Sequence, residues 1–355
     1  MSISARSPSS SHPAPLVAAV VVNWNGLEDT FACIRSLFGQ THANLEVHVV
    51  DNGSVGDDAD QLFDTFGNSI RLYRNSRNEG FTGGCNTALT TILDERRADF
   101  AALLNNDAEA EPGWIAALLA AAHEHPDAGH FASRMVFHDR PSVIENAGVA
   151  ILSNGDAVPR GRGRPSSTFA HPADVLGACG GAAMYRVDML REIGLFADEF
   201  FANFEDVDLS LRAVARGWRC RYVPGAIVRH RLSRTIAKVR DDAFHARSLR
   251  NLYVATWVNL PWQVLLLDLP WIVLRDVAIT VLAPLFRQSR VARISRAARR
   301  AAWSDRALVR ARRASLRPLR RGSWLRIWWM QGSFVPAYWR FFVDAIVMRR
   351  RGFLE

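Results

Sequence analysis

The stretch LVAAVVVNWNG (residues 16–26) is an unbroken apolar run that ends in a polar loop. LEVHVVDNGS (45–54) and FAALLNNDAE (100–109) repeat the same design further along the chain. Strands that are apolar on both faces are typical of a parallel sheet that is covered by helices on both sides. The three stretches therefore predict the strands of such a sheet.

Helix-like stretches separate these strands and follow them, around 29–38, 83–97 and 112–125. The last begins with Pro112, which suits the first turn of a helix. A shorter strand is expected at 70–75. Strands that alternate with helices indicate an α/β fold, with a mostly parallel central sheet and helices on both faces.

Each of the three strong strands ends in asparagine or aspartate. One such ending is an ordinary turn preference, but ligands of open α/β sheets bind beyond the carboxyl ends of the strands. Three such endings on one edge therefore predict a binding site. The residues concerned are Asn23, Asn25, Asp51, Asn52, Asn105, Asn106 and Asp107.

The second half of the chain is more mixed. Residues 153–173 read as a Gly/Pro/Arg loop, and 175–186 as a strand whose small residues allow close approach to the backbone. A helix is expected at 205–216 and a short strand at 218–224. We expect GAIVRHRLSR (225–234) to be a loop.

The positive charge of the chain is concentrated near its end. Of the net charge of +9, the stretch from Arg287 to Arg321 carries +12, with thirteen arginines and one acid, so the remainder sums to −3. The four cysteines, far apart and without a C-x-x-C pair, argue against a zinc site or a disulfide framework. They favour a reduced, cytoplasmic setting. They are Cys33, Cys85, Cys179 and Cys220.

Residues 251–286 are strongly apolar and aromatic, but prolines and charges, among them Asp268 and Arg275, interrupt them. No clean window of about 20 apolar residues exists for a membrane-spanning helix. With the arginine-rich stretch behind it, we expect this segment to lie on or dip into an anionic membrane surface. A helical subdomain packed on the body, or a dimer interface, is the alternative.

Several motifs occur together and in order: VVNWNG, VVDNGS, NEGFTGGCN, LLNNDAE, GACGGAAMYR, FFANFEDVDLSLRAVARGWRCRYVPGAIVRH and RSLRNLY. In this combination the chain resembles the family 2 glycosyltransferases, and among them the bacterial rhamnosyltransferase-like branch that builds cell-wall and surface polysaccharides. The resemblance covers about 17–251 and leaves out the basic tail. It implies a GT-A fold that transfers a sugar from a nucleotide donor with inversion.

The expected organisation has three parts. Residues 1–15, rich in Ser and Pro, form a disordered tail, and 16–250 form the GT-A glycosyltransferase domain. Residues 251–355 form an apolar, aromatic and Arg-rich helical region that associates with the membrane.

A divalent cation, Mg²⁺ or Mn²⁺, is the expected cofactor, because the leaving nucleoside diphosphate gains charge in the transition state. The resemblance assigns metal binding to Asp107 and His230; His230 completes the site or contacts the pyrophosphate. Asn105 stands where many relatives carry the first Asp of a D-x-D motif. A strand-ending turn for Asp107 and a structural role for His230 are the alternatives.

The resemblance also assigns the donor nucleotide site. Asp51 matches the residue that hydrogen-bonds the base or ribose, with turn chemistry as the alternative. Gly83 and Gly84 in the same motif suit helix-start packing. The full predicted donor set is Asn23, Asn25, Asp51, Asn75, Asn78, Gly80, Phe81, Asn86 and Asn106.

Inverting transfer needs a base that takes the proton of the acceptor hydroxyl. Asp206 matches the family's base, and Glu205 is expected to bind the acceptor or orient the base, with Gly180 and Gly181 on the acceptor side. Asp208 faces away from Asp206 on a helix and is expected to pair with a structural partner such as Arg212. The alternative is that these acids only begin a helix, where negative charge is favoured.

We therefore expect an inverting, metal-dependent glycosyltransferase. It would move L-rhamnose from dTDP-L-rhamnose onto a lipid-linked or cell-surface polysaccharide acceptor, as a peripheral or monotopic protein at the cytoplasmic face of the inner membrane. A UDP- or GDP-sugar donor is the alternative within this class. We expect any oligomer to form through the C-terminal region.

A non-enzymatic basic protein that binds membrane or nucleic acid through its arginines is a rival of a different class. The basic stretch has few aromatic residues for base stacking until Trp324 and lies beside an apolar segment. Membrane phosphate is therefore favoured, and no nucleic acid partner is expected. No nucleophile elbow, Walker motif or Q-x-x-R-W motif supports a hydrolase, a nucleotidyltransferase or a processive synthase.

Overall fold

The computed structural model describes residues 14–232, 241–285 and 287–335. A ten-stranded mixed sheet lies at its centre, and a separate two-stranded hairpin lies beside it. The sheet strands are β1 (Val17–Asn23), β2 (Leu45–Asp51), β3 (Arg71–Arg74), β4 (Phe100–Leu104), β5 (Ala108–Ala110), β6 (Ala128–Phe137), β7 (Arg140–Asn146), β10 (Ala173–Val175), β11 (Ala182–Arg186) and β12 (Arg219–His230). The hairpin consists of β8 (Val149–Ile151) and β9 (Ala157–Pro159).

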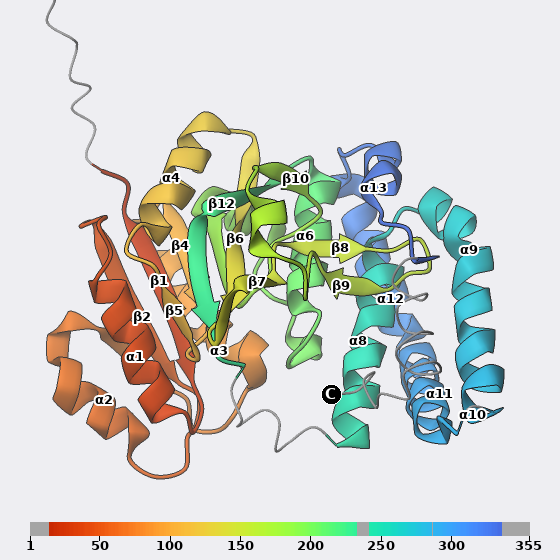
Figure 1. Cartoon of the computed structure of the whole chain (residues 1–355), viewed down its shortest axis with the longest axis horizontal. Helices are drawn as coiled ribbons and strands as arrows, with labels where there is room; N and C mark the ends of the chain where they lie inside the picture. The colour runs from red at the N-terminus through yellow and green to blue at the C-terminus, as the bar shows by residue number, and fades with distance from the viewer. Residues whose placement is uncertain (1–13, 233–240, 286, 336–355) are drawn as a thin grey trace, which may run out of the picture.

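The strands run in the order β10-β12-β6-β11-β4-β1-β2-β3, with β5 beside β12 and β7 beside β6 (Figure 1). The segment from β4 to β3 is parallel, as the apolar runs predict. Beyond it the sheet is mixed, because β11 is antiparallel to both β4 and β6. The predicted tail, except for residues 14 and 15, and the end of the predicted C-terminal region lie outside the described residues.

The prediction of a loop at 225–234 is wrong for residues 225–230, which continue β12. Ile227–His230 pair with β6 on one side, and Val228–His230 pair with β5 on the other. The pairing with β6 shifts register between Val223 and Ile227, so Pro224 and Gly225 need no partner on that strand. Pairing with two neighbours outweighs the local turn signal, and it places His230 at a strand end.

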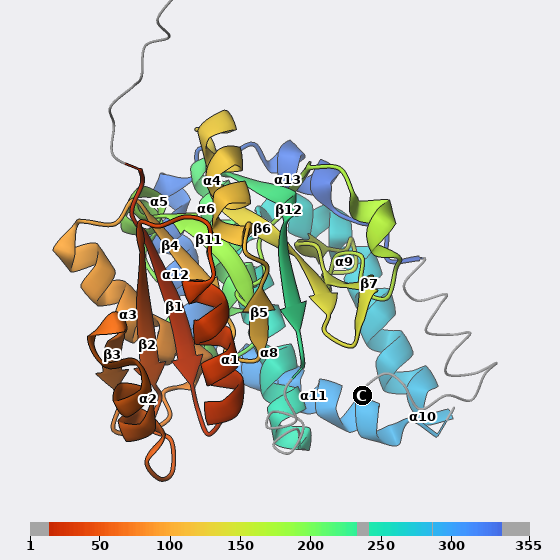
Figure 2. The same cartoon turned by 60° about the vertical axis from the view of Figure 1, so that its left-hand side comes forward.

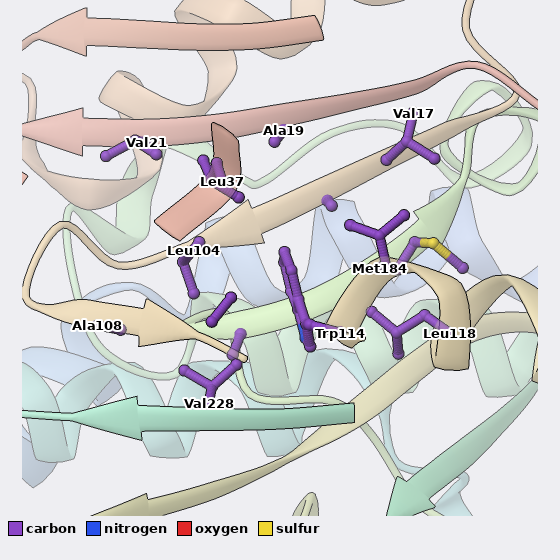
Figure 3. Packing of buried hydrophobic residues seen from close by; sticks show 14 of the residues in the cluster. Val17, Ala19, Val21, Leu37, Leu104, Ala108, Trp114, Leu118, Met184 and Val228 are labelled. Atoms are coloured by element: carbon purple, nitrogen blue, oxygen red, sulfur yellow. The ribbon is translucent and has the colours of Figure 1, made fainter. Parts of the chain in front are cut away.

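Helices cover both faces of the sheet (Figures 1 and 2). One face carries α1 (Leu27–Phe38), α2 (Asp58–Phe66) and α4 (Trp114–Glu124); the other carries α3 (Gly80–Glu95), α5 (Val187–Ile193) and α6 (Glu205–Arg216). Figure 3 shows the apolar core between the sheet and the face with α1, α2 and α4, where Leu37 and Trp114 pack against strand residues such as Val21 and Leu104. The predicted helices are confirmed, and α6 matches its predicted bounds; α2 and the hairpin were not predicted.

The C-terminal region is helical, and in Figure 1 its helices lie on the side away from α1 and α2. The helices are α8 (Asp242–Asn259), α9 (Trp262–Val277), α10 (Ala283–Leu285), α11 (Ser289–Ser304), α12 (Arg306–Leu316) and α13 (Trp324–Met330). A third apolar cluster joins them to the outer side of α6, through residues such as Leu211, Val258 and Val309. The predicted division at residue 250 falls inside α8.

Candidate active site

The strand ends meet at one edge of the sheet, as the sequence predicts. The parallel register of β1 and β2 places Asn23 beside Asp51, and Asn23 Nδ2 donates a hydrogen bond to Asp51 Oδ1 at 3.0 Å. Asn23 is fully buried, and its Oδ1 accepts from Thr30 Oγ1, which in turn accepts from Asn106 Nδ2. Asn23 and Asn106 thus form a network that holds the end of β2 and Asp51.

Asn25 and Ser54 connect the loops that follow β1 and β2. Asn25 has a positive φ of 51°, its Oδ1 accepts from the Val55 N–H at 2.7 Å, and its own N–H donates to Ser54 Oγ at 3.0 Å. The Ser54 N–H donates to Asp51 Oδ2. The loops around Asp51 are therefore fixed before any ligand binds.

Asn52 forms hydrogen bonds to the predicted donor residues that follow β3. The sequence placed it at the end of a strand but did not include it in the donor set. Its Oδ1 accepts from Asn75 Nδ2 at 2.9 Å, and its Nδ2 donates to Asn78 Oδ1 and to the Gly80 carbonyl. Gly80 has a φ of +74°, and a Cβ there would collide with the carbonyl of Phe201. Asn75, Asn78 and Gly80 are thus brought together beside β2.

Asn86 is not part of this network, unlike the other predicted donor residues Asn75, Asn78 and Gly80. Its Nδ2 donates to the carbonyl of Phe196 at 2.8 Å and to Asp198 Oδ1, and its Oδ1 accepts from the Phe196 N–H. These bonds tie α3 to the segment that precedes α6.

The two predicted metal ligands, Asp107 and His230, face each other. His230 Nε2 lies 3.0 Å from Asp107 Oδ1, and both residues are buried. Burial alone would lower the pKa of His230, but the hydrogen bond and charge of Asp107 and the charge of Glu145 raise it to about 9. An ion that bound Asp107 and His230 together would take the place of the proton on Nε2, because only the neutral imidazole is a metal ligand.

Glu145 is a residue that the sequence reasoning missed. It is buried at the end of β7, its Oε1 accepts from Arg162, and its Oε2 lies 3.6 Å from His230 Nδ1. Histidine ligands of metals commonly have a carboxylate on their other ring nitrogen. The one signal for it in the sequence is an acid inside the apolar stretch VIENAG (143–148).

Within the described residues, no group of three or more His, Cys, Asp or Glu side chains is arranged to hold a metal by itself. A cation that takes its other ligands from a diphosphate and water needs only one or two protein groups. One carboxylate and one imidazole, with Glu145 behind the imidazole, fit that requirement.

The predicted base lies in a pocket of about 480 Å³. Glu205 and Asp206, on the first turn of α6, line it together with Asn105 and Glu145. Asn105 Nδ2 lies 3.5 Å from His230 Nε2, so the pocket adjoins the Asp107–His230 pair. Its walls include Phe81, the hairpin residues Val158 and Pro159, and Phe244, His245 and Ser248 of α8.

The two carboxyl groups on α6 have different partners. Asp206 accepts hydrogen bonds from the N–H groups of Val207 at 2.8 Å and Gly180 at 3.0 Å, whereas Glu205 Oε2 is buried without a hydrogen-bond partner. Burial, and then the charge of Asp206, raise the pKa of Glu205 to about 8; burial also raises the pKa of Asp206. The backbone donors favour the ionised form of Asp206. Glu205 is therefore protonated at neutral pH, and of the two carboxyl groups Asp206 is the one whose ionised form the backbone N–H groups favour.

Gly180 and Gly181 lie where the sequence predicts close approach to the backbone. A Cβ on Gly180 would lie 3.2 Å from the Phe81 ring, and one on Gly181 would lie 3.0 Å from Asn105 Nδ2. Gly181 also lines the pocket. Gly180 acts on Asp206 through its N–H, a role that the sequence did not predict.

The loop before α6 has an unusual backbone. Phe201, Asn203 and Phe204 all have positive φ, a region that side chains with a Cβ rarely adopt. Asn251 of α8 is fully buried, and its Nδ2 donates to the carbonyls of Phe200, Ala202 and Asn203 at 2.7, 3.0 and 3.1 Å. α8 therefore holds the loop that sets the position of Glu205 and Asp206.

The prediction that Asp208 pairs with Arg212 is confirmed, with Arg212 Nε 2.9 Å from Asp208 Oδ2. Asp208 is fully buried and also accepts from Asn259 of α8. Its role is structural, and it faces away from the pocket.

Comparisons with known proteins identify the family of the chain. The model of "Glycosyl transferase family 2" matches residues 19–194, and that of "Glycosyl transferase family group 2" matches 141–343, which is more than half of the chain. The chain is 28% identical over 237 residues to the N-acetylglucosaminyl-diphospho-decaprenol L-rhamnosyltransferase of Mycobacterium tuberculosis, covering 60% of this chain and 74% of that protein. It spans only 24 to 37% of the length of the first curated relatives that it matches.

Two solved structures share the fold. The mannosyltransferase PcManGT from Pyrobaculum calidifontis, in complex with GDP-Man and Mn²⁺, has a TM-score of 0.50 at 14% identity, over 94% of this chain and 88% of that one. GalNAc-T7 with UDP, GalNAc and Mn²⁺ has a TM-score of 0.54 at 15% identity, over 69% of this chain and 48% of that one. The expected GT-A-like α/β fold is thus confirmed, and together with the family models it shows that the chain belongs to the family 2 glycosyltransferases.

Proposed function

We propose that this protein transfers a sugar from a nucleotide donor to an acceptor hydroxyl, with inversion at the sugar carbon. The observation that supports this most is the pair of carboxyl groups on α6, in a pocket that adjoins Asp107 and His230. Asp206 retains partial contact with solvent through the pocket and accepts two backbone hydrogen bonds. It is placed to receive a proton from a hydroxyl that enters the pocket.

Glu205 has a complementary role in this proposal. A protonated carboxyl can donate a hydrogen bond, and pairs of carboxyl groups with separated pKa values divide such tasks in many enzymes. Glu205 would donate to the acceptor or hold its hydroxyl toward Asp206. Gly180 fixes the orientation of the Asp206 carboxylate through its N–H.

Asp107 and His230 are the residues that would hold Mg²⁺ or Mn²⁺, with Glu145 orienting the imidazole. A bound divalent cation supplies charge stabilisation to the leaving diphosphate. Asp51 and the network around Asn52, which includes Asn75 and Asn78, form the side of the site that we assign to the nucleoside.

We propose L-rhamnose from dTDP-L-rhamnose as the donor, and a lipid-linked or cell-surface polysaccharide at the cytoplasmic face of the inner membrane as the acceptor. The sequence motifs and the similarity to a rhamnosyltransferase support this choice. Donors carrying UDP or GDP are the alternatives, since two proteins of similar fold were solved with UDP and with GDP-Man.

The test is a comparison of nucleotide sugars with the purified full-length protein. We expect dTDP-L-rhamnose to bind in the presence of Mn²⁺ more tightly than UDP-N-acetylglucosamine or GDP-mannose in calorimetry. Labelled sugar should then pass into the lipid fraction of membranes supplied as acceptor. Preference for a UDP- or GDP-sugar would replace the rhamnose assignment, and the absence of binding by every nucleotide sugar would contradict the proposed function.

A further inference from the structure

The helix α9 has its polar side turned inward. Asp268 and Arg275 are only 1% and 6% exposed. Arg275 Nη1 donates to Asp156 Oδ1 of the β8–β9 turn at 2.7 Å, and Asp268 Oδ2 accepts from Gln331 Nε2 at 2.6 Å. The charges that interrupt this apolar sequence are therefore used in contacts with the β8–β9 turn and with the residue that follows α13.

The outward side of α9 is apolar. Trp262, Leu266, Leu269, Val273 and Val277 recur at the spacing of one helical stripe and are 64, 60, 50, 51 and 51% exposed. Further exposed apolar side chains flank this stripe or continue from it: Leu267, Trp271, Leu274, Val281 and Leu285. In water a surface helix carries its apolar residues toward the core and its polar residues outward. This helix has the reverse arrangement.

α13 extends the apolar face. The rings of Trp271 and Phe334 lie 5.3 Å apart, which joins α9 to the segment after α13. Trp328 and Trp329 on α13 are 38% and 76% exposed. Contiguous apolar surface of this kind marks a contact with another apolar phase or a partner.

The surroundings of this face are cationic. α9 is the outermost helix in Figure 1, and α10 and α11 lie at its lower end. α11 and the turn before it expose a series of arginines: Arg287, Arg290, Arg293, Arg296 and Arg300. Asp242 of α8 pairs with Arg290 and lies 3.8 Å from Arg293, so it offsets only part of this charge. A second copy of this chain would bring like charges together around the two apolar faces. An anionic lipid surface would pair with them instead.

We propose that the outward face of α9, together with Trp328 and Trp329, docks on an anionic lipid bilayer. The helix lies in the plane of the interface with its apolar face in the boundary between headgroups and acyl chains. Tryptophan side chains suit this depth. The arginines of α11 contact lipid phosphates. No helix among residues 14–232, 241–285 and 287–335 is long and apolar enough to cross a membrane.

The docking face is coupled to the pocket by one hairpin. Val158 and Pro159 of β9 line the pocket, and Asp156, one residue before β9, binds Arg275 of α9. The helix that would rest on lipid, α9, therefore also holds the hairpin that forms one wall of the pocket. The docking itself does not depend on the proposed transfer reaction, and it is measured without any sugar.

The experiment uses full-length protein and two kinds of vesicle, one of phosphatidylcholine alone and one that also contains phosphatidylglycerol. We expect co-sedimentation with the anionic vesicles, weakened by added salt. The variant Leu266→Gln/Leu269→Gln/Val273→Gln should lose about tenfold or more in vesicle affinity, because binding scales with the apolar area that enters the interface. A matched control is Phe38→Gln/Val55→Gln/Phe63→Gln, which removes exposed apolar side chains near α1 and α2 and should bind like the wild type.

Two further measurements decide other outcomes. Arg293→Gln/Arg296→Gln should reduce the preference for anionic vesicles while leaving residual binding. If the triple variant of α9 does not fold, judged by thermal melting, Trp262→Ser/Trp329→Ser takes its place. Unchanged binding by a folded face variant overturns the proposal. So does a wild-type protein that ignores vesicles and forms a dimer that the face variant abolishes.

Discussion

Arg312 Nη2 lies 3.1 Å from both carboxylate oxygens of Asp208, which is buried two residues after the proposed base Asp206. Arg312 belongs to the arginine-rich stretch, so part of that charge stabilises the helix that carries the active site. Burial would raise the pKa of Asp208, but Arg212 and Arg312 lower it below its usual value. The basic stretch is therefore in part a structural element of the body.

Replacing Arg312 by Met should destabilise the fold, because it removes one of the cations that compensate a fully buried carboxylate. Asp208 keeps Arg212 and Asn259, so we expect a loss of about 2 kcal/mol rather than the full cost of an unpaired buried charge. Denaturant unfolding measures the difference. Arg310→Met, at an exposed position of the same helix, is the control and should change stability by less than about 0.5 kcal/mol.

Asn251→Ala should lower turnover more than it lowers donor affinity. The three carbonyls of residues 200, 202 and 203 lose their common donor, so the strained loop relaxes and shifts Asp206. Displacement of a catalytic group by about 1 Å can cost about a hundredfold in rate. Thr256→Val, buried on the same helix and bonded only to carbonyls of its own helix, is the matched control. Equal loss in both variants would assign the effect to general packing of α8.

Asp206→Asn should retain folding and donor binding but lose about 10²- to 10⁴-fold in sugar transfer, as expected for a lost general base. Glu205→Gln should cost less, because Gln still donates a hydrogen bond. The measurement is transfer at saturating donor, with thermal melting as the folding control. If Asp206→Asn folds and works within a few-fold of the wild type, the acids of α6 only begin the helix.

Stability should depend on pH through Glu205. Its pKa is raised to about 8 in the folded state, so its stabilising contribution is present at low pH and is lost as pH rises toward 8. Relative to Glu205→Gln, the wild type should therefore weaken between about pH 4.5 and pH 8, by up to about 1.4 kcal/mol per pH unit, and then level off. Unfolding curves at several pH values test this. A difference that stays constant with pH would show that Glu205 is ionised throughout.

Removal of divalent metal with EDTA should abolish transfer, and Mn²⁺ or Mg²⁺ should restore it. Asp107→Asn should weaken the metal-dependent part of nucleotide binding, because a carboxylate is the stronger ligand for a hard cation. Glu109→Gln, two residues away and paired with Arg231 at the surface, is the control. Full activity of the wild type in EDTA would exclude the metal role of Asp107 and His230.

The sequence by itself determined the first half of the sheet, the helices α1, α3 and α4 and the family. An apolar run indicates a strand that is buried on both faces, and an Asn or Asp at its end indicates a polar edge of the sheet. Both patterns lie within a few neighbouring residues. The bounds of α6 were equally local, because Gly217 at its C-terminus and acids on its first turn stand at fixed positions along the chain. Asp107 and His230 were paired through the family resemblance, and the fold brings them within 3.0 Å.

Only the tertiary structure decided which polar groups lack partners and which side of a helix faces outward. Glu145 enters the site because β7 pairs with β6, and Asn251 because α8 packs beside the loop before α6. The apolar segment after residue 250 reads as interrupted by charges. The fold turns Asp268 and Arg275 inward to Gln331 and Asp156, which leaves the apolar face outside. These partners are 63 and 119 residues away, so no local pattern could indicate them.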